Sequence, residues 1–299
     1  MIRQYKTANT YFKEKFGCKV YKLALDGGMT CPNRDGTLGT RGCIFCSSGG
    51  SGDFAQKQCG NISTQIELAK ARLIGKNSGE QYIAYFQSYT NTYADVEVLR
   101  KLFVPAISEN SVVGLSIATR PDCLPPDVIA LIAELNSIKP VFIELGLQTI
   151  HGKTADFIRR GYELRVYDDA VSALHKAGVH IITHMILGLP GENQHMMQET
   201  AKYIGEAGSH GVKLQLLHIL KDTDLEVFYN DGNFSALAKK EYIDALCKCV
   251  LCLPENTVLH RITGDAPKQL LIAPKWSADK KRVLQEIRDE FSRRNILLI

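Results

Sequence analysis

The stretch Ile181-Ile-Thr-His-Met-Ile-Leu-Gly-Leu-Pro-Gly191 decides the fold class of this chain of 299 residues. Its first seven residues form an apolar, β-branched run as long as a buried strand, and the glycines and proline that follow end this run. Helical patterns flank it at 165–177 and 195–207, and Gly178 supplies a helix stop after the first of them. A buried strand between two helices is typical of a parallel α/β sheet.

The same alternation of strand and helix repeats along most of the chain. Strands are predicted at 20–25, 82–87, 112–118, 141–147, 181–187 and 212–217. Helices are predicted at 63–74, 96–107, 126–135, 165–177 and 195–207. This pattern predicts an α/β barrel or a doubly wound sheet, and both place their sites at the carboxyl ends of the strands.

The composition indicates the cellular compartment of the protein and the role of its cysteines. The net charge of +4 is too small to prove an anionic partner. The first residues are polar, and no apolar run approaches the ~20 residues of a membrane span, so we expect a cytoplasmic protein with reduced thiols and no membrane partner. An odd count of nine cysteines argues against a complete disulfide framework and favours metal or redox chemistry.

Three cysteines lie in the loop after the first predicted strand, at C-x11-C-x2-C spacing: Cys31, Cys43 and Cys46. The loop is rich in glycine, so its backbone can curl and turn N–H groups toward one centre. A closed zinc site needs four ligands, and no histidine precedes His151. Three thiolates on a [4Fe–4S] cluster would leave one iron open for another ligand. The spacing therefore favours an open cluster over zinc or over cysteines that only pack.

With Phe45 directly before its last cysteine, this loop resembles the cluster loop of radical S-adenosylmethionine (SAM) enzymes. Nearly the whole chain is similar to the YtqA/YhcC family, relatives of the radical-SAM subunit of Elongator, and the segments at 86–93 and 262–267 carry this similarity. The resemblance implies an α/β fold, a partial (β/α)6 TIM-type barrel with N- and C-terminal extensions. The implied division is 1–18, 19–234 and 235–299.

The resemblance also implies an enzyme with named cofactor contacts. Cys31, Cys43 and Cys46 would hold a [4Fe–4S] cluster whose open iron chelates SAM, and electron transfer would cleave SAM to a 5′-deoxyadenosyl radical. An arginine suits the SAM carboxylate because its fork bonds both oxygens. The implied SAM contacts are Phe45, Gln87, Ser88, Thr90, Thr119, Gln148, Arg160, His184, Leu187 and Gly188.

The remaining cysteines are predicted to be structural. In a helix predicted at 237–253, Cys247 and Cys249 point about 200° apart, so they do not converge on a second cluster. Buried helical cysteines, which behave as small hydrophobes, are the better interpretation. Cys18, Cys59 and Cys123 are isolated and receive the same interpretation.

The substrate is less clearly indicated. The first 22 residues hold six Lys/Arg and one acid among five aromatic residues, and further basic residues lie at 268–294. Basic and aromatic residues together suit a single-stranded nucleic acid loop, although charge alone favours a solvated face on an extended terminus. Candidate substrate contacts are His218, Lys221, Lys275 and Trp276, and no catalytic acid or base is assigned.

The family resemblance implies the tRNA anticodon loop as partner and the C5 side chain of the wobble uridine as the reacting group, converting carboxymethylaminomethyl-uridine to aminomethyl-uridine. It also implies an external electron donor of the flavodoxin or ferredoxin kind. Two other classes stay open. One is a radical SAM enzyme for a small metabolite or a peptide, and the other is a non-catalytic metal-binding regulator.

Overall fold

A parallel sheet of seven strands forms the centre of the computed structural model, which describes residues 2–73 and 80–299. Its strands take the order β2-β3-β4-β5-β6-β7-β9. The first six are β2 (Tyr21–Leu25), β3 (Tyr82–Phe86), β4 (Val112–Thr119), β5 (Val141–Gln148), β6 (His180–Leu187) and β7 (Gly211–Leu216). They confirm the six predicted strands, whose ends differ from the observed ones by a single residue.

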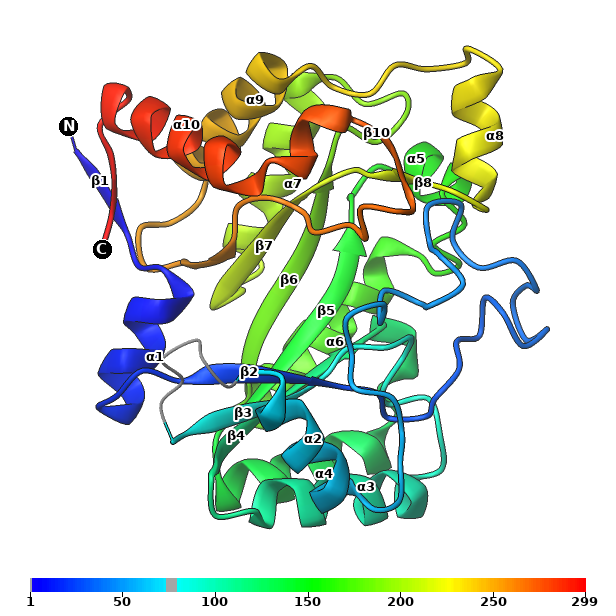
Figure 1. Cartoon of the computed structure of the whole chain (residues 1–299), viewed down its shortest axis with the longest axis vertical. Coiled ribbons are helices and arrows are strands. Elements are labelled where there is room, and N and C mark those ends of the chain that lie inside the picture. The colour runs from blue at the N-terminus through cyan, green and yellow to red at the C-terminus, as the bar shows by residue number, and fades with distance from the viewer. Residues whose placement is uncertain (1, 74–79) are drawn as a thin grey trace.

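Helices connect successive strands, and all of them except the short α5 (Gly152–Phe157), which lies past the end of β5, pack on the outer face of the sheet (Figure 1). The others are α2 (Ile62–Ala71), α3 (Val96–Ser108), α4 (Pro126–Ile138), α6 (Leu164–Lys176) and α7 (Gln194–Glu206). The side chains of Asn61 and Asn193 cap α2 and α7 by accepting a backbone N–H of the first turn. The five predicted helices are confirmed, although residue 74, the predicted end of the first, lies outside the described residues.

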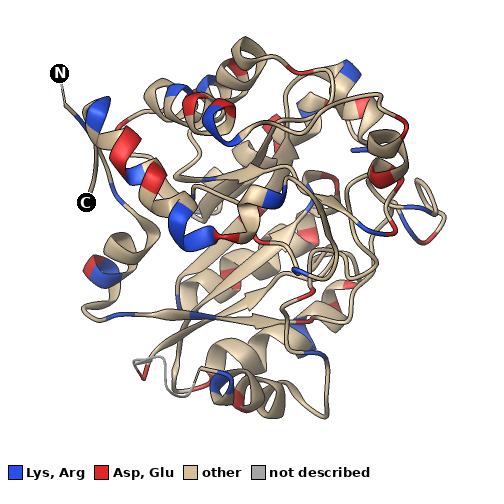
Figure 2. Ribbon diagram, turned by 45° about the horizontal axis from the view of Figure 1, so that its top comes forward, with Lys and Arg blue, Asp and Glu red and all other residues tan. Residues whose placement is uncertain are grey.

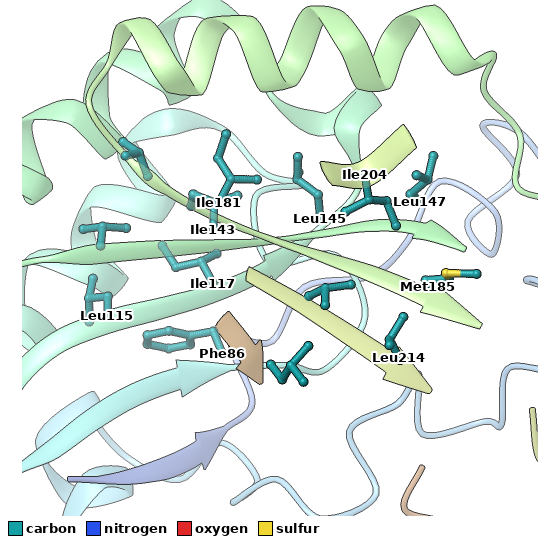
Figure 3. Packing of buried hydrophobic residues seen from close by; sticks show 14 of the residues in the cluster. Phe86, Leu115, Ile117, Ile143, Leu145, Leu147, Ile181, Met185, Ile204 and Leu214 are labelled. Atoms are coloured by element: carbon teal, nitrogen blue, oxygen red, sulfur yellow. The ribbon is translucent and has the colours of Figure 1, made fainter. Parts of the chain in front are cut away.

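The sheet separates two kinds of side chain because neighbours along a strand point to opposite faces. Ile143, Leu145 and Leu147 of β5 face outward and pack with the helices in a fully buried core (Figure 3). The residues between them, among them Glu144 and Gly146, therefore face the concave side. This concave side is the inside of a partial TIM-type barrel.

The barrel is open between its edge strands β2 and β9 (Val258–Arg261), which lie at opposite ends of the strand order. The seventh strand was not predicted, because four residues are too short to show a strand period. It lies in the segment 235–299, for which only a helical extension was expected. The boundaries at 18/19 and 234/235 stay predictions.

The two ends of the chain lie side by side (Figure 1). β1 (Arg3–Tyr5) pairs in parallel with β11 (Ile296–Leu298), and the Tyr5 hydroxyl donates to the carbonyl of Val250 at 2.8 Å. Val250 belongs to α9 (Lys239–Cys252), which packs against α7 and α10 (Lys280–Arg293). The remaining elements are α1 (Ala8–Phe16), β8 (Ile219–Leu220), α8 (Asp224–Asn230), β10 (Leu271–Ala273) and two short 3₁₀ helices.

The N-terminal aromatic residues were expected to form a nucleic-acid-binding rim, and the structure corrects this expectation. Tyr5 is fully buried, and Phe12 of α1 packs on Ile83, Phe142 and Ile182, which lie near the amino ends of their strands. The rings therefore close the amino end of the barrel, opposite the end at which the cysteine loop lies. Local composition did not distinguish stacking platforms from a hydrophobic plug.

Four of the eight basic residues at 268–294 form ion pairs, namely Lys280, Arg282, Arg293 and Arg294. Acidic and basic residues alternate along α10 (Figure 2), where Arg282 pairs with Glu286 at 3.0 Å and Arg293 pairs with Glu290 at 2.5 Å. Exposed pairs of this kind contribute little stability, but they neutralise the helix surface. These pairs reduce the positive charge of the basic tail, and its contact with nucleic acid stays a prediction.

The isolated and helical cysteines divide into two groups. Cys247 and Cys249 of α9 are fully buried, as predicted, and Cys123 is buried as well. Cys18 and Cys59 are only half-buried, so the prediction of burial does not hold for them. Within 2–73 and 80–299, no helix combines the length and hydrophobicity that crossing a membrane requires.

Candidate active site

The glycine-rich loop after β2 brings its three cysteines to one cavity of about 190 Å³. Cys31, Cys43 and Cys46 all line it. Gly42 adopts a φ of 75° beside the Arg34 side chain, a conformation that residues with a side chain rarely adopt. The Gly42 N–H donates to the carbonyl of Asn33 at 2.7 Å, which folds the loop back on itself. The loop thus gathers thiols that are twelve and three residues apart.

N–H donors lie beside two of these cysteines. The Asn33 amide donates to Cys43 Sγ at 3.4 Å, and Arg34 Nη2 donates to the Cys46 carbonyl at 2.9 Å. Burial and the neighbouring Cys46 thiol raise the pKa of Cys43 to about 11. Thiolates at this position therefore require compensation by positive charge, which a bound metal centre supplies.

The donor set fits a cluster with one open iron. In the described part of the chain, no three His, Cys, Asp or Glu side chains are arranged around a single metal ion. The cysteines of a four-iron cluster bind different irons and lie farther apart than ligands of one ion. Three thiols in one cavity wall, among N–H donors, are therefore consistent with a [4Fe–4S] cluster rather than a zinc ion.

Most of the predicted SAM contacts share this cavity. Besides the cysteines, it is lined by Phe45, Gln87, Thr90, Thr119, Gln148, Arg160 and His184. Gln148 ends β5 with a φ of 66°, next to a register irregularity between Gly146 and Gln148. A residue other than glycine in this conformation costs free energy, and such strain concentrates at functional sites. The roles of these side chains toward SAM stay predictions.

Three predicted SAM contacts do not line the cavity, because the strand alternation turns them away from it. Ser88 follows the inward-facing Gln87, and its buried hydroxyl packs against Gly52 without a hydrogen-bond partner. Leu187 belongs to the core on the outer face of the sheet. Gly188 faces the side chain of Leu237. The cavity wall does not include these three residues, and their roles toward SAM stay predictions.

Arg160 lies in the cavity wall, but its donors are already engaged. Its guanidinium donates to the carbonyls of Thr149 at 2.6 Å and Tyr162 at 2.9 Å. A second arginine, Arg120, lines the same cavity and holds Asp122 with both arms of its fork, at 2.9 and 2.7 Å. Arg120 was not predicted as a site residue, although its position directly after β4 was the available signal.

A polar layer crosses the barrel below the cysteines and continues the cavity. It takes one inward-facing residue from each of β2 to β7, namely Lys22, Tyr85, Ser116, Glu144, His184 and Lys213. Glu144 is fully buried and accepts from Lys22 at 2.5 Å, from Ser116 at 2.7 Å and from His184 at 2.8 Å. Lys213 donates to Glu144 and, at 3.1 Å, to the Tyr85 hydroxyl.

The charges of this layer follow from its contacts. Burial alone would raise the pKa of Glu144, but Lys213 and Lys22 hold it well below its usual range. Burial lowers the pKa of His184 to about 4, so its ring is neutral and Gln215 donates to its Nδ1 at 3.2 Å. Burial also lowers the pKa of Lys213 to about 7, although Glu144 opposes that shift.

Except for His184, the polar layer was missed from sequence. The available signal was a charged residue within a predicted buried strand, since such a residue requires a partner of opposite charge. Glu144 lies in the middle of β5 and Lys213 within β7. Lys22 of β2 was instead counted with the basic N-terminal segment.

The four predicted substrate contacts lie outside the cavity. His218 Nε2 lies 3.1 Å from the Ser277 hydroxyl, and Lys275 donates to the carbonyl of Leu271 at 2.7 Å. Trp276 donates to the Leu237 carbonyl, while Lys221 is exposed and does not line the cavity. Three of these side chains contact other parts of the chain and Lys221 faces solvent, so their roles toward the substrate stay predictions.

Two family models match the chain. The one described as the Radical SAM superfamily matches residues 36–204, and the one described as the Radical SAM C-terminal domain matches residues 209–293. "Uncharacterized protein YtqA" of Bacillus subtilis is 45% identical over 98% of this chain and 91% of its own length. Protein YhcC of Escherichia coli is 38% identical over 89% of this chain and 85% of its own length.

A more distant relative is the tRNA uridine(34) acetyltransferase of Methanocaldococcus jannaschii, 25% identical over 55% of this chain and 30% of its own length. Among solved structures, the archaeal Elp3 of Methanocaldococcus infernus with an N-terminal deletion superposes with a TM-score of 0.69. It is 17% identical, and the match covers 93% of this chain and 63% of that chain. The structural similarity shows a common fold.

Proposed function

This chain belongs to the radical SAM superfamily, and we propose that it modifies the C5 side chain of the wobble uridine in tRNA. It is a radical SAM enzyme that uses a [4Fe–4S] cluster and SAM. When bound, this pair supplies a one-electron cleavage of SAM that removes a hydrogen atom from the substrate. The reaction we propose converts carboxymethylaminomethyl-uridine to aminomethyl-uridine.

One observation carries the catalytic part of the proposal. The cavity wall holds three cysteines, a strained Gln148 and the inward-facing residues of the polar layer together. Cys31, Cys43 and Cys46 would hold the cluster. Gln87, Thr90, Thr119 and Gln148, at or after the ends of β3, β4 and β5, would orient SAM, and Phe45 would exclude water beside it.

The substrate part is supported by the distant relatives. One of them is named for acetyl transfer to uridine 34 of tRNA, and this chain covers 30% of that protein. The alignment supports a shared kind of substrate rather than a shared reaction. We propose the anticodon loop as the macromolecular partner, a flavodoxin- or ferredoxin-like protein as electron donor, and the cytoplasm as the compartment.

The proposed reaction balances with SAM as the two-electron oxidant and water as co-reactant. The carbon between the side-chain nitrogen and the carboxylate loses a hydrogen atom and one electron, and water then cleaves its C–N bond. The products are aminomethyl-uridine and glyoxylate, together with methionine, 5′-deoxyadenosine and a proton. The electron that is supplied to begin SAM cleavage is recovered when the substrate loses its electron, so the reaction consumes no net reductant.

The test is anaerobic reconstitution with iron and sulfide, followed by dithionite, SAM and unfractionated tRNA, with nucleosides and 5′-deoxyadenosine measured by mass spectrometry. We expect carboxymethylaminomethyl-uridine to fall as aminomethyl-uridine and deoxyadenosine rise. Alanine at Cys43 should abolish both changes, whereas alanine at Cys59, a half-buried cysteine outside the cavity, should preserve them. Deoxyadenosine without any nucleoside change would refute the tRNA substrate and retain the radical chemistry.

A further inference from the structure

The cavity at the cysteines continues into a second one of about 650 Å³. Tyr85, Lys213 and Arg261 line both. The second cavity is also lined by Lys22 of β2 and by His260 of β9, the two edge strands of the open barrel. The two cavities therefore form one passage, the lateral cleft, from the cysteine loop to the open side of the barrel.

Cationic side chains outnumber the carboxylates that neutralise them in the middle of the lateral cleft. Lys22 and Lys213 share the single carboxylate of Glu144. Arg261 lies 3.6 Å from Asp265, which also pairs with Lys280 at 2.5 Å. Lys280 lies outside the cleft, so in the middle of the cleft three cations, Lys22, Lys213 and Arg261, face the two carboxylates of Glu144 and Asp265. The remaining acid in the wall of the second cavity, Asp53, belongs to the cysteine loop and accepts from Ser47.

His260 is an unsatisfied polar side chain in this wall. Both of its ring nitrogens are buried and have no hydrogen-bond partner. Burial holds the pKa of His260 well below its usual range, so the ring is neutral and offers one donor and one acceptor. Buried polar groups are normally paired, and an unpaired one at a cavity wall is consistent with a polar ligand.

We propose that Lys22, Lys213 and Arg261 form a carboxylate-binding site that holds the side-chain carboxylate of the substrate. The inference rests on the proposed function for the identity of this carboxylate. A carboxylate accepts from two or more cationic donors at once, and a shared Glu144 leaves donor capacity on both lysines. The reacting carbon is bonded directly to the carboxylate. A bound carboxylate therefore positions the reacting carbon in the part of the cleft that the cysteines line.

A competing explanation is that the lysines serve only to neutralise Glu144. Buried carboxylates require such partners, and loss of one lysine would leave an uncompensated negative charge that repels any anion. The two explanations differ in a double variant. Lys213→Met with Glu144→Gln removes a cation and its internal partner together, so only a carboxylate site would still be damaged.

The experiment measures equilibrium binding of two anticodon stem-loops to the cluster-loaded protein with SAM and without reductant. One stem-loop carries carboxymethylaminomethyl-uridine, and the other carries the uncharged carboxamide of the same side chain. We expect the wild type to prefer the acid by about tenfold to a hundredfold, the range for a hydrogen bond to a charged group. Lys213→Met and Arg261→Met should each remove most of this preference.

The matched control is Lys139→Met. The Lys139 ammonium donates to the carbonyls of Glu109 at 2.9 Å and Val112 at 2.7 Å, beside the amino end of β4 and outside the cleft. This variant should keep the wild-type preference. The Lys213→Met, Glu144→Gln double variant should lack it. A double variant with the wild-type preference would overturn the carboxylate site, because the lysine would then be needed only to neutralise Glu144.

Failure of this inference is distinguishable from failure of the proposed function. If the wild type converts the nucleoside but binds acid and carboxamide equally, the carboxylate site alone is wrong. If no nucleoside is converted, N-methylglycine replaces the stem-loop as probe in saturation-transfer NMR. Binding that is lost in Lys213→Met would retain a carboxylate site without the tRNA substrate, and absence of binding to the wild type would overturn both.

Discussion

Replacing Phe12 by alanine tests whether the N-terminal aromatic residues are core or substrate contacts. The Phe12 ring is 4% exposed and lies 5.3 Å from the ring of Phe142 and 5.7 Å from that of His260, measured between centroids. Removing a buried phenylalanine costs about 3–5 kcal/mol, because apolar contacts are lost and a cavity remains. Stability of the whole barrel should fall, since α1 packs against three of its strands.

The free energy lost in Phe12→Ala corresponds to a shift of the melting temperature. Unfolding entropy is about 2.1 cal/mol/K per residue, or roughly 0.6 kcal/mol/K for 299 residues. A loss of about 4 kcal/mol therefore lowers the Tm by about 6 °C. Differential scanning calorimetry measures this shift. The control replaces the exposed lysines of the same helix, Lys13 and Lys15, by alanine and should leave the Tm within about 1 °C.

Affinity for tRNA at 25 °C supplies the second measurement. The Phe12 ring packs on Ile83, Phe142 and Ile182, but it also lines the lateral cleft, where the Lys22 ammonium lies 5.7 Å from its centroid. We therefore expect Phe12→Ala to change the affinity for tRNA only together with the fall in Tm. A variant with an unchanged Tm and a tenfold weaker affinity for tRNA would refute this reasoning. It would return the N-terminal segment to the nucleic-acid interface that its composition first indicated.

Two further predictions concern the cavity. Because burial lowers the pKa of Lys213 to about 7, the ammonium is present below this pH and lost above it, while His184 and Glu144 do not titrate in that range. The preference for the acid stem-loop over its carboxamide should therefore fall as the pH rises from 6 to 8.5, and a preference that is constant with pH would contradict the assignment. Gln148→Gly should relieve the strain of its positive φ and stabilise the protein by about 1 kcal/mol in denaturant titrations, while SAM binding measured by equilibrium dialysis weakens. Unchanged SAM affinity would remove Gln148 from the set of cofactor contacts.

The strands and the cysteine loop could be predicted because their signals are local. An apolar, β-branched run is visible within seven residues, and the Cys31 to Cys46 spacing is visible within sixteen. The polar layer could not be predicted in the same way. Both faces of these strands are enclosed, so the alternation that marks inward positions was hidden within nearly continuous apolar runs.

Contacts between residues far apart in the sequence were the second reason why the polar layer could not be predicted. The pairing of Lys22 with Glu144 joins residues 122 apart, and Lys213 reaches Glu144 from 69 residues away. The register between strands decides which charges meet, and it is set by the folded sheet instead of by neighbours in sequence. The same reason explains Phe12, whose partners Phe142 and His260 come from distant strands.

The pairing of β1 with β11 has a consequence for biosynthesis. Arg3 lies opposite Ile296, so the ribosome adds 292 residues between the two partners. At about 5–20 residues per second, roughly 15 to 60 s separate their synthesis. During that interval the first strand has no edge to join, and the carbonyl of Val250 that accepts from Tyr5 is also made late. The barrel strands from β2 to β9 are made before β11, so β1 pairs with β11 only after all the strands of the barrel have been synthesised.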